Sequence, residues 1–342
     1  MKILITGNRG YVGSVLMRHL LKRYQASNLL GFDIGYFDEN IDQKFLPELN
    51  TIETIFKDIR DIEENDLKGV EKIVHLAAIS NDPMGKLFKD ETHHVNFLST
   101  INLAEIGKRV GVKKFIFASS CSMYGSAPGK PRKENDILNP LTDYASSKVN
   151  SEVGLKNLAT DDFKVICLRF STACGFSPNL RLDLVLNDFI ASSIVNKNIT
   201  VLSDGSPWRP LIHVKDMAKS IEWALNFEIE NNFEEYNVGS DEWTWQIKDL
   251  AKNLGSLLNG IEVSINNDAS PDKRSYKVDF SKFKFASDEK IKFEDFESSV
   301  EEFIRGTINY NFLNFRQSHF MRFNYLKSQI DSKLLDNKLR RL

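Results

Sequence analysis

The sequence of 342 residues has little of several features that would assign a chain to a special class. Three cysteines, Cys121, Cys167 and Cys174, form no metal-ligand spacing and favour a reducing compartment over a disulfide framework. No apolar run approaches the ~18 residues that span a bilayer, and the first residues, MKILITGNRG, lack the apolar stretch of a signal peptide. The net charge of -2 favours neither nucleic acid nor an anionic membrane. We therefore expect a cytoplasmic protein without a membrane span.

Composition and periodicity instead indicate an ordinary globular chain of α/β class. Hydrophobic residues make up 42% and charged residues 27% of the sequence, and its length suits two modest domains or one large one. In the first half, short apolar runs alternate with segments of helical period, which is typical of a parallel, doubly wound sheet. Strands are expected at 2–6, 28–33, 51–58, 71–78, 113–120 and 164–169, and helices at 11–24, 94–110 and 142–159.

The alternation breaks after residue 170, and this predicts three parts of the chain. Residues 1–170 should form the doubly wound domain. Residues 171–310 should form mainly a smaller, mixed α/β substrate lobe at the carboxyl ends of the strands, where such sheets bind their ligands. Residues 311–342 are expected to form a basic, helical extension.

Three glycines follow the first expected strand. Gly7, Gly10 and Gly13 in ITGNRGYVG would allow a tight turn, a close approach to a pyrophosphate, and helix packing on the sheet. The helix amino end would then present unpaired N–H groups to the phosphates. Such glycines are often only a turn, but Asp33 ends the second strand, where a carboxylate accepts hydrogen bonds from the adenosine ribose. Together these features predict a Rossmann-type dinucleotide-binding domain.

Asp33 also bears on which dinucleotide binds. Its carboxylate would repel a 2′-phosphate, and no arginine follows it immediately, so NAD is favoured over NADP. Arg9, inside the glycine turn, is a mild argument for NADP because it could pair with a phosphate.

Candidate catalytic residues lie at the end of the strand 113–120 and on the following helix. In DYASSK, Tyr144 and Lys148 are four residues apart and so share one helix face. An ammonium group beside a tyrosine favours the phenolate, which can then accept a proton from a substrate hydroxyl. Alone, such a pair is usually a solvated helix face. The strand end ASSCSMYG adds serine hydroxyls that can hydrogen-bond the same substrate oxygen, so a hydride-transfer site is predicted.

These residues resemble the extended short-chain dehydrogenase/reductases of the NAD-dependent nucleotide-sugar epimerase/dehydratase family, from the amino terminus to about residue 305. The glycines match TGxxGxxG, and Tyr144 and Lys148 match YxxxK. Counting back from the YG at 124–125 gives Ser120 the catalytic Ser/Thr position. The resemblance implies further contacts with NAD at Tyr11, Val12, Asp58, Ile59, Leu76, Ala77, Ala78, Asn96 and Ser119.

The second lobe also matches the family. SDGSPWRPLIHVKDMA and PDKRSYKVDFSK resemble segments in which arginines meet the sugar-nucleotide diphosphate, which gives that role to Arg209 and Arg274. The alternative for both is a surface ion pair, but two arginines in matching segments favour anion binding. Asn187 resembles a substrate-loop asparagine, and Thr172 replaces an asparagine that often contacts substrate.

The resemblance implies an NAD-dependent epimerase that oxidises the C4 hydroxyl of a nucleoside-diphosphate sugar and returns the hydride to the other face. Release of the oxidised sugar would instead make it a dehydrogenase, or in reverse a reductase. The family's 4,6-dehydratases carry an acidic pair where this chain has Cys121 and Ser122, which disfavours dehydration. An alternative of another class is a non-catalytic dinucleotide sensor on the same fold. The Ser–Tyr–Lys set argues against it, because a sensor has no use for a base. The family commonly forms homodimers through the YxxxK helix.

The carboxyl-terminal residues 314–342 carry an amphipathic pattern, in which Phe323, Leu326, Ile330 and Leu334 recur at spacings of three or four. This favours a helix docked on its own subunit or on a partner. A membrane-surface helix is the weaker alternative, because acidic residues interrupt its basic face. Since every motif lies upstream, we expect loss of this segment to spare cofactor binding.

Overall fold

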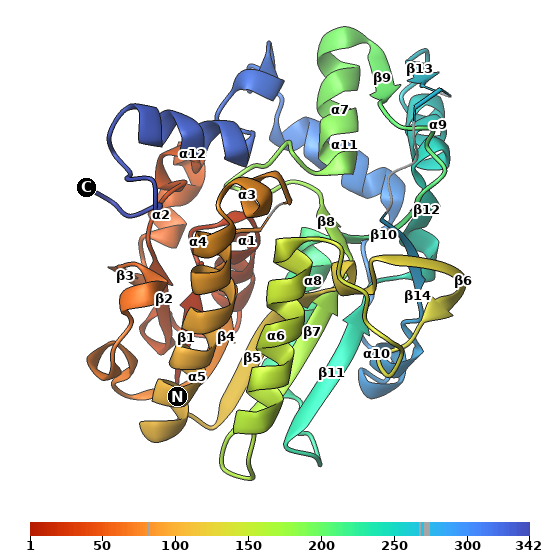
Figure 1. The fold of residues 1–342 in the computed structure, drawn as a ribbon. Coiled ribbons are helices and arrows are strands. Elements are labelled where there is room, and N and C mark those ends of the chain that lie inside the picture. Colours follow the sequence, from red (N-terminus) through yellow and green to blue (C-terminus); the bar gives the residue numbers. More distant parts are fainter. Residues whose placement is uncertain (81, 267, 270–273) are drawn as a thin grey trace.

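A seven-stranded parallel sheet forms the centre of the protein, in a computed structural model that describes residues 1–80, 82–266, 268–269 and 274–342 (Figure 1). Its strand order is β11-β7-β5-β4-β1-β2-β3, so the order reverses between β1 and β4. The predicted doubly wound sheet is thereby confirmed, with one strand more than the first half supplies. The strands are β1 (Lys2–Thr6), β2 (Leu29–Asp33), β3 (Glu53–Phe56), β4 (Val70–His75), β5 (Lys114–Ser120), β7 (Lys164–Phe170) and β11 (Phe233–Val238).

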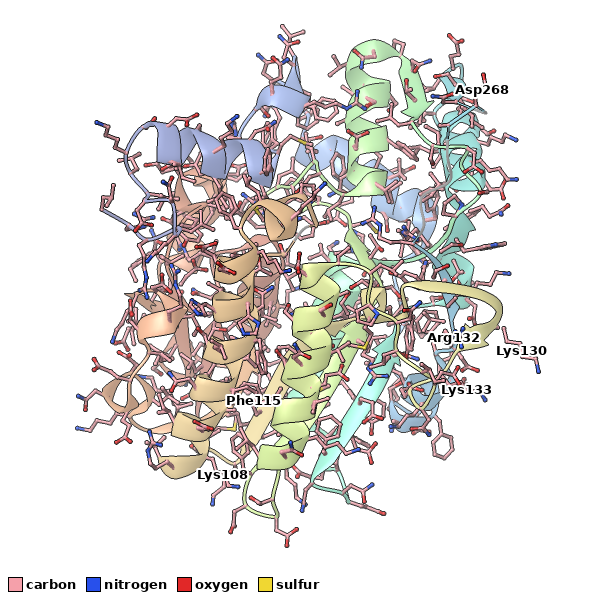
Figure 2. The ribbon with its side chains drawn as sticks, in the orientation of Figure 1. Lys108, Phe115, Lys130, Arg132, Lys133 and Asp268 are labelled. Carbon is pink, nitrogen blue, oxygen red and sulfur yellow. The ribbon has the colours of Figure 1, made fainter. Side chains whose placement is uncertain are left out.

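Helices cover both faces of this sheet (Figure 1). The helices α1 (Tyr11–Leu20) and α8 (Val214–Asn226) share a core with one face, and α5 (Ser99–Arg109) and α6 (Asp143–Leu158) cover the other. Phe115 on β5, labelled in Figure 2, is fully buried in the core that the sheet shares with α5 and α6. Because central parallel strands are buried on both faces, they read as nearly continuous apolar runs, which is why the sequence identified them.

The second lobe has its own apolar core and small sheets. Two sheets have the orders β12-β10-β8 and β13-β9, and β14 pairs with β6 in a third. Lys130, at the tip of the β6 segment, points away from the protein (Figure 2). The elements are β6 (Ser126–Arg132), β8 (Thr172–Cys174), β9 (Asn198–Val201), β10 (Trp208–His213), β12 (Thr244–Gln246), β13 (Glu262–Ile265), β14 (Ser275–Val278), α7 (Val185–Asn196), α9 (Ile247–Leu257), α10 (Ser281–Ala286) and α11 (Phe296–Gly306).

The two parts of the chain interleave more than a boundary at residue 170 implies. Strand β11 and helix α8 come from residues 171–310 but complete the central sheet and its covering layer. In return, β6 leaves the first part and pairs with β14 of the second. Short helices α2 (Leu46–Leu49), α3 (Asp82–Leu87) and α4 (Lys89–His93) connect strands of the first part.

The carboxyl-terminal segment docks on its own chain through helix α12 (Arg322–Asp331), as Figure 1 shows. Leu326 is buried in the core, and Phe323 and Ile330 pack against it. The expectation for Leu334 is wrong, because that side chain is 54% exposed while Leu335 is buried. The helix ends before these residues, and Lys333 adopts a left-handed φ of 57°, so the chain turns and the helical spacing no longer applies.

The three cysteines are buried free thiols, as expected for side chains that pack in the core: Cys121, Cys167 and Cys174. Among the residues that the structure describes, no helix has the length and apolar character to cross a membrane.

Candidate active site

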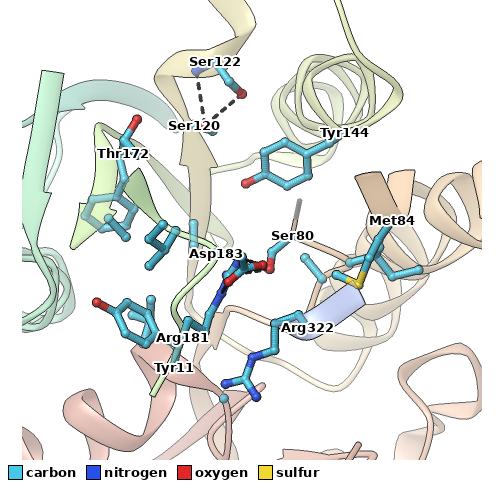
Figure 3. A pocket seen from close by; sticks show the side chains of 18 of the residues that line it. Tyr11, Ser80, Met84, Ser120, Ser122, Tyr144, Thr172, Arg181, Asp183 and Arg322 are labelled. Carbon is cyan, nitrogen blue, oxygen red and sulfur yellow. Dashed lines mark hydrogen bonds and ion pairs between the residues drawn. The ribbon is translucent and has the colours of Figure 1, made fainter. Parts of the chain in front are cut away.

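A cavity of about 750 Å³ opens across the carboxyl ends of β1, β2, β4, β5 and β7. Its walls come from both parts of the chain, with the glycine turn on one side and β10 and β14 on the other. It lies where the strand order reverses, which is where open α/β sheets bind ligands. Figure 3 shows side chains from several strand ends converging on this space.

The glycine turn shapes one end of the cavity. Gly7 has a φ of +70°, and a Cβ there would lie 2.8 Å from the backbone nitrogen of Ala77. A Cβ on Gly13 would lie 2.1 Å from the Gly7 carbonyl oxygen, so the helix can begin this close to the turn only with glycine. Gly10 caps α1 without a side-chain hydrogen bond from any described residue, which leaves amide groups for an anion. The turn therefore fits a dinucleotide pyrophosphate.

Asp33 lies at the end of β2 beside this turn. Its carboxylate accepts hydrogen bonds from the backbone N–H groups of Gly35 at 2.7 Å and Arg9 at 3.0 Å. Burial raises the pKa of Asp33, and these two donors oppose the rise. The Arg9 guanidinium pairs with Asp38 and donates to Asn50 at 3.0 Å, so its charge is already matched within the fold. This weakens the one argument for NADP.

Most residues predicted to bind the cofactor line the cavity, and one does not. Asn96 is fully buried and exchanges two hydrogen bonds with the backbone of Ile79, at 2.8 and 2.9 Å. It also donates to the Ser147 hydroxyl at 3.2 Å, so it fixes the loop after β4 against α6 and does not face the cavity. The predicted residues in the wall are Gly7, Gly10, Tyr11, Val12, Gly13, Asp33, Asp58, Ile59, Leu76, Ala77, Ala78, Ser119, Tyr144 and Lys148.

Ser120, Tyr144 and Lys148 all line the same cavity. The Ser120 hydroxyl donates to Ser122 at 2.9 Å, and the Lys148 ammonium donates to the carbonyl of Ala118 at 2.7 Å. The Lys148 nitrogen lies 5.7 Å from the centre of the Tyr144 ring. Figure 3 shows the Tyr144 hydroxyl pointing into the pocket, between Ser120 and Ser80. The structure therefore brings the predicted hydroxyl, phenol and ammonium groups to one place.

Lys148 is 3% exposed, and this burial lowers its pKa to about 8. A charge held at this position costs folding free energy, but it also places a positive field beside the Tyr144 ring.

Replacing Lys148 by Met should stabilise the cofactor-free protein by about 1–3 kcal/mol at pH 7, because a buried charge is removed. Below pH 8 both states of the wild type bind the proton, so the gain is complete. From pH 8 to about 10.5 only the unfolded state binds it, so wild-type stability rises and the gain disappears. Urea unfolding at pH 7 and pH 10 measures this, and an equal difference at both pH values would contradict it.

Four of the five residues predicted to bind substrate line the cavity: Ser120 at the end of β5, and Thr172, Arg209 and Arg274 on the second-lobe side. The Arg209 guanidinium lies 5.4 Å from the Tyr276 ring centre and donates to the backbone oxygen of Arg274, so the two arginines are adjacent. Asn187 is fully buried and does not face the cavity. Its side chain accepts from the Gly175 N–H at 2.9 Å and donates to the Arg181 carbonyl at 2.9 Å, so it shapes a loop.

Two further groups of residues line the wall without a signal in the sequence. Arg181 is only 8% exposed; it forms a two-point ion pair with Asp183 and donates to the Ser80 hydroxyl at 2.9 Å. These residues come from irregular loops without a spacing that could identify them. Arg322 and Leu326 also line the cavity, so the carboxyl-terminal segment contributes to its wall although every sequence motif lies upstream of residue 314.

No carboxylate occupies positions 121 and 122, next to Ser120. The Cys121 thiol is buried and donates to the Arg169 carbonyl at 3.0 Å, on the side away from the cavity. Ser122 does line the cavity and is hydrogen-bonded to Ser120. This strand end can therefore polarise a hydroxyl but offers no acid–base pair.

Comparisons with known proteins show which family the chain resembles. The model of the NAD dependent epimerase/dehydratase family matches residues 3–239. An uncharacterized UDP-glucose epimerase, YtcB, of Bacillus subtilis is 32% identical over 241 residues, covering 66% of this chain and 72% of that protein. A putative UDP-glucose 4-epimerase of Methanocaldococcus jannaschii is 30% identical over 67% of this chain and 74% of its own.

Solved structures share the fold. The UDP-glucuronic acid 4-epimerase from Bacillus cereus, in complex with UDP-glucuronic acid and NAD, superposes with a TM-score of 0.78 at 24% identity. The match covers 91% of this chain and 100% of that one. About a tenth of this chain therefore has no counterpart there.

Proposed function

The chain belongs to the NAD-dependent epimerase/dehydratase family, and on this premise we propose that it is a nucleoside-diphosphate-sugar epimerase acting on the C4 hydroxyl. NAD is the cofactor of this family. The observation that carries the proposal is the convergence of Ser120, Tyr144 and Lys148 in a cavity that two arginines of the second lobe, Arg209 and Arg274, also line.

In this proposal Ser120, Tyr144 and Lys148 each have a separate role in the oxidation of the sugar hydroxyl. Tyr144 accepts the proton of the sugar hydroxyl, and the buried Lys148 ammonium favours the phenolate that can do so. Ser120 orients the same hydroxyl oxygen, with its own position held by Ser122. Bound NAD would supply the hydride acceptor and donor. The glycine turn and Asp33 would hold its pyrophosphate and adenosine ribose.

The substrate diphosphate would bind Arg209 and Arg274, since arginine pairs well with phosphate oxygens. A firm hold there lets an oxidised sugar turn without leaving, which epimerisation requires. The names of the relatives make UDP-hexoses the first substrates to test. Because Cys121 is buried and Ser122 is neutral, we do not expect the loss of water that 4,6-dehydratases catalyse.

The test is to incubate the enzyme with candidate UDP-hexoses and no added oxidant or reductant. Chromatography follows the sugar, and absorbance at the reduced-nicotinamide band follows the cofactor. A new epimer without lasting NADH supports the proposal. Stoichiometric NADH with a released keto sugar would assign a dehydrogenase instead, and a product that has lost water would assign a dehydratase.

Replacing Asp33 by Ser should narrow the preference for NAD over NADP, because the serine no longer repels a 2′-phosphate. Calorimetric titration with both dinucleotides measures the two affinities. In the wild type we expect NAD to bind more tightly. The preference is not due to Asp33 if the ratio of affinities stays the same in the variant.

We also propose that the protein is a homodimer through the helices α5 and α6. Val153 on α6 is 59% exposed, and Leu98, in the turn preceding α5, is 44% exposed. Val153→Glu should therefore convert a dimer into a monomer in sedimentation, whereas Ile308→Glu, at a more exposed apolar residue of the second lobe, should not. Identical sedimentation of both variants and wild type would contradict this interface.

A further inference from the structure

Arg322, at the start of α12, is a buried cation inside the cavity wall. It is 2% exposed, although it comes from the carboxyl-terminal segment. One terminal nitrogen, Nη2, donates to the backbone oxygen of Asn179 at 3.0 Å and to its side-chain oxygen at 2.5 Å. The other, Nη1, is buried without a hydrogen-bond partner among the described residues. A buried guanidinium normally has partners for its donors, so an acceptor is missing here.

The surroundings of Arg322 place it on the cofactor side of the cavity. Its guanidinium lies 4.0 Å from the centre of the Phe37 ring, in the loop that follows β2 and Asp33. Asn179, which holds it, also donates to the carbonyl oxygens of Arg9 at 2.7 Å and Phe37 at 2.9 Å. Arg322 is therefore tied to the glycine turn and to the loop that carries the ribose-binding carboxylate.

The positive charge of Arg322 is not fully compensated by its neighbours, which favours binding of an anion. Burial and the neighbouring Arg181 both act against its positive charge, while Asp183 and Asp33 act in its favour. Asp183 is already paired with Arg181 through two hydrogen bonds, and Asp33 is held by two backbone amides. A phosphate would therefore supply both the missing acceptor and the missing negative charge. Figure 3 shows Arg181 and Arg322 entering the pocket close together.

Other residues of the carboxyl-terminal segment contact the loop that follows β2. The Arg341 guanidinium donates to the Gly35 carbonyl, and the Tyr36 hydroxyl donates to the Leu339 carbonyl. The Arg60 guanidinium donates to the Lys338 carbonyl at 2.7 Å. The segment thus holds the loop after β2 in place from outside.

We propose that Arg322 is a cofactor ligand, which binds the diphosphate of NAD from the carboxyl-terminal segment, opposite the amide groups of α1. The substrate diphosphate is the less suitable anion, because we assign it to Arg209 on β10 and Arg274 next to β14, both in the second lobe. The proposal rests on NAD binding and not on the fate of the sugar. It can therefore fail while the epimerase assignment holds, and the epimerase assignment can fail while Arg322 still binds NAD.

The test is calorimetric titration of nucleotide-free, full-length protein with NAD, ADP-ribose and adenosine. In Arg322→Gln we expect NAD and ADP-ribose to bind about 10- to 100-fold more weakly, and adenosine to bind within threefold of wild type. Lys327→Gln, which removes an exposed charge from the same helix, should leave all three within twofold. Tyr325→Phe, which removes only a hydrogen bond to Glu39, should do the same.

Two outcomes would overturn the proposal. An ADP-ribose affinity within threefold of wild type in a folded Arg322→Gln variant would show that no phosphate contacts this residue. Equal weakening of adenosine and ADP-ribose would show that Arg322 only holds the segment in place. If Arg322→Gln melts far below wild type, the same titrations of Arg322→Lys test the proposal. It keeps the charge but loses the fork of donors, so ADP-ribose should weaken about 3- to 10-fold and adenosine should not.

Discussion

Replacing Tyr144 by Phe should lower turnover about 100- to 10,000-fold while the fold and NAD binding persist. The phenol is the group that points into the cavity, and Lys148 lies beside its ring. Phenylalanine keeps the ring and its packing but cannot accept or return a proton. The loss should therefore appear in kcat, with little change in the calorimetric affinity for NAD.

The matched control is Tyr24→Phe, which removes an exposed hydrogen bond to Asn226 far from the cavity. Its turnover and melting temperature should match those of wild type. Tyr144 is not the base if the Tyr144→Phe variant melts normally and turns over within tenfold of wild type.

Replacing Glu152 by Gln should destabilise the protein by about 3–5 kcal/mol, because it leaves a buried guanidinium without its counter-charge. Glu152 on α6 and Arg169 on β7 are each 5% exposed and are joined by hydrogen bonds of 2.7 to 3.1 Å. The same helix carries Tyr144 and Lys148, so this ion pair also fixes the proposed catalytic groups against the sheet. Turnover should fall together with stability.

Glu301→Gln provides the comparison, because Glu301 forms an exposed ion pair with Arg305 at 3.7 Å. Exposed pairs four apart on a helix contribute only about 0.3–0.5 kcal/mol. Guanidinium chloride unfolding of both variants measures the contrast. If Glu152→Gln lowers the free energy of unfolding by less than 1 kcal/mol, the buried ion pair does not stabilise the protein as we expect.

The parts of the site that the sequence predicted are those with a local mechanism. Gly7 and Gly13 need their spacing because a Cβ would collide within the turn, and Tyr144 and Lys148 share a face because of the helical period. The central strands were recognisable because burial on both faces leaves them apolar. Each of these features can be recognised within fewer than ten residues.

The parts that failed depend on tertiary contacts. Asn96 and Asn187 have the expected residue types near the cavity, but their amides bind backbone groups of neighbouring loops. Arg181 comes from a loop without a pattern, and the apolar spacing of the helix that begins at Arg322 predicts docking but no place in the cavity wall. Leu335 replaces Leu334 in the core because a left-handed residue interrupts the helix, which periodicity does not predict.

The position of β11 has a consequence for how the chain folds. β11 pairs with β7 along the whole strand, from Val165 to Phe170, yet residues 171–232 stand between them and form much of the second lobe. Until that insertion has folded, β7 is an apolar strand with an open edge, to which another chain can pair. Late pairing over such a distance is slow. Refolding should therefore be concentration-sensitive, with aggregation nucleating at β7 and suppressed once β11 closes the edge.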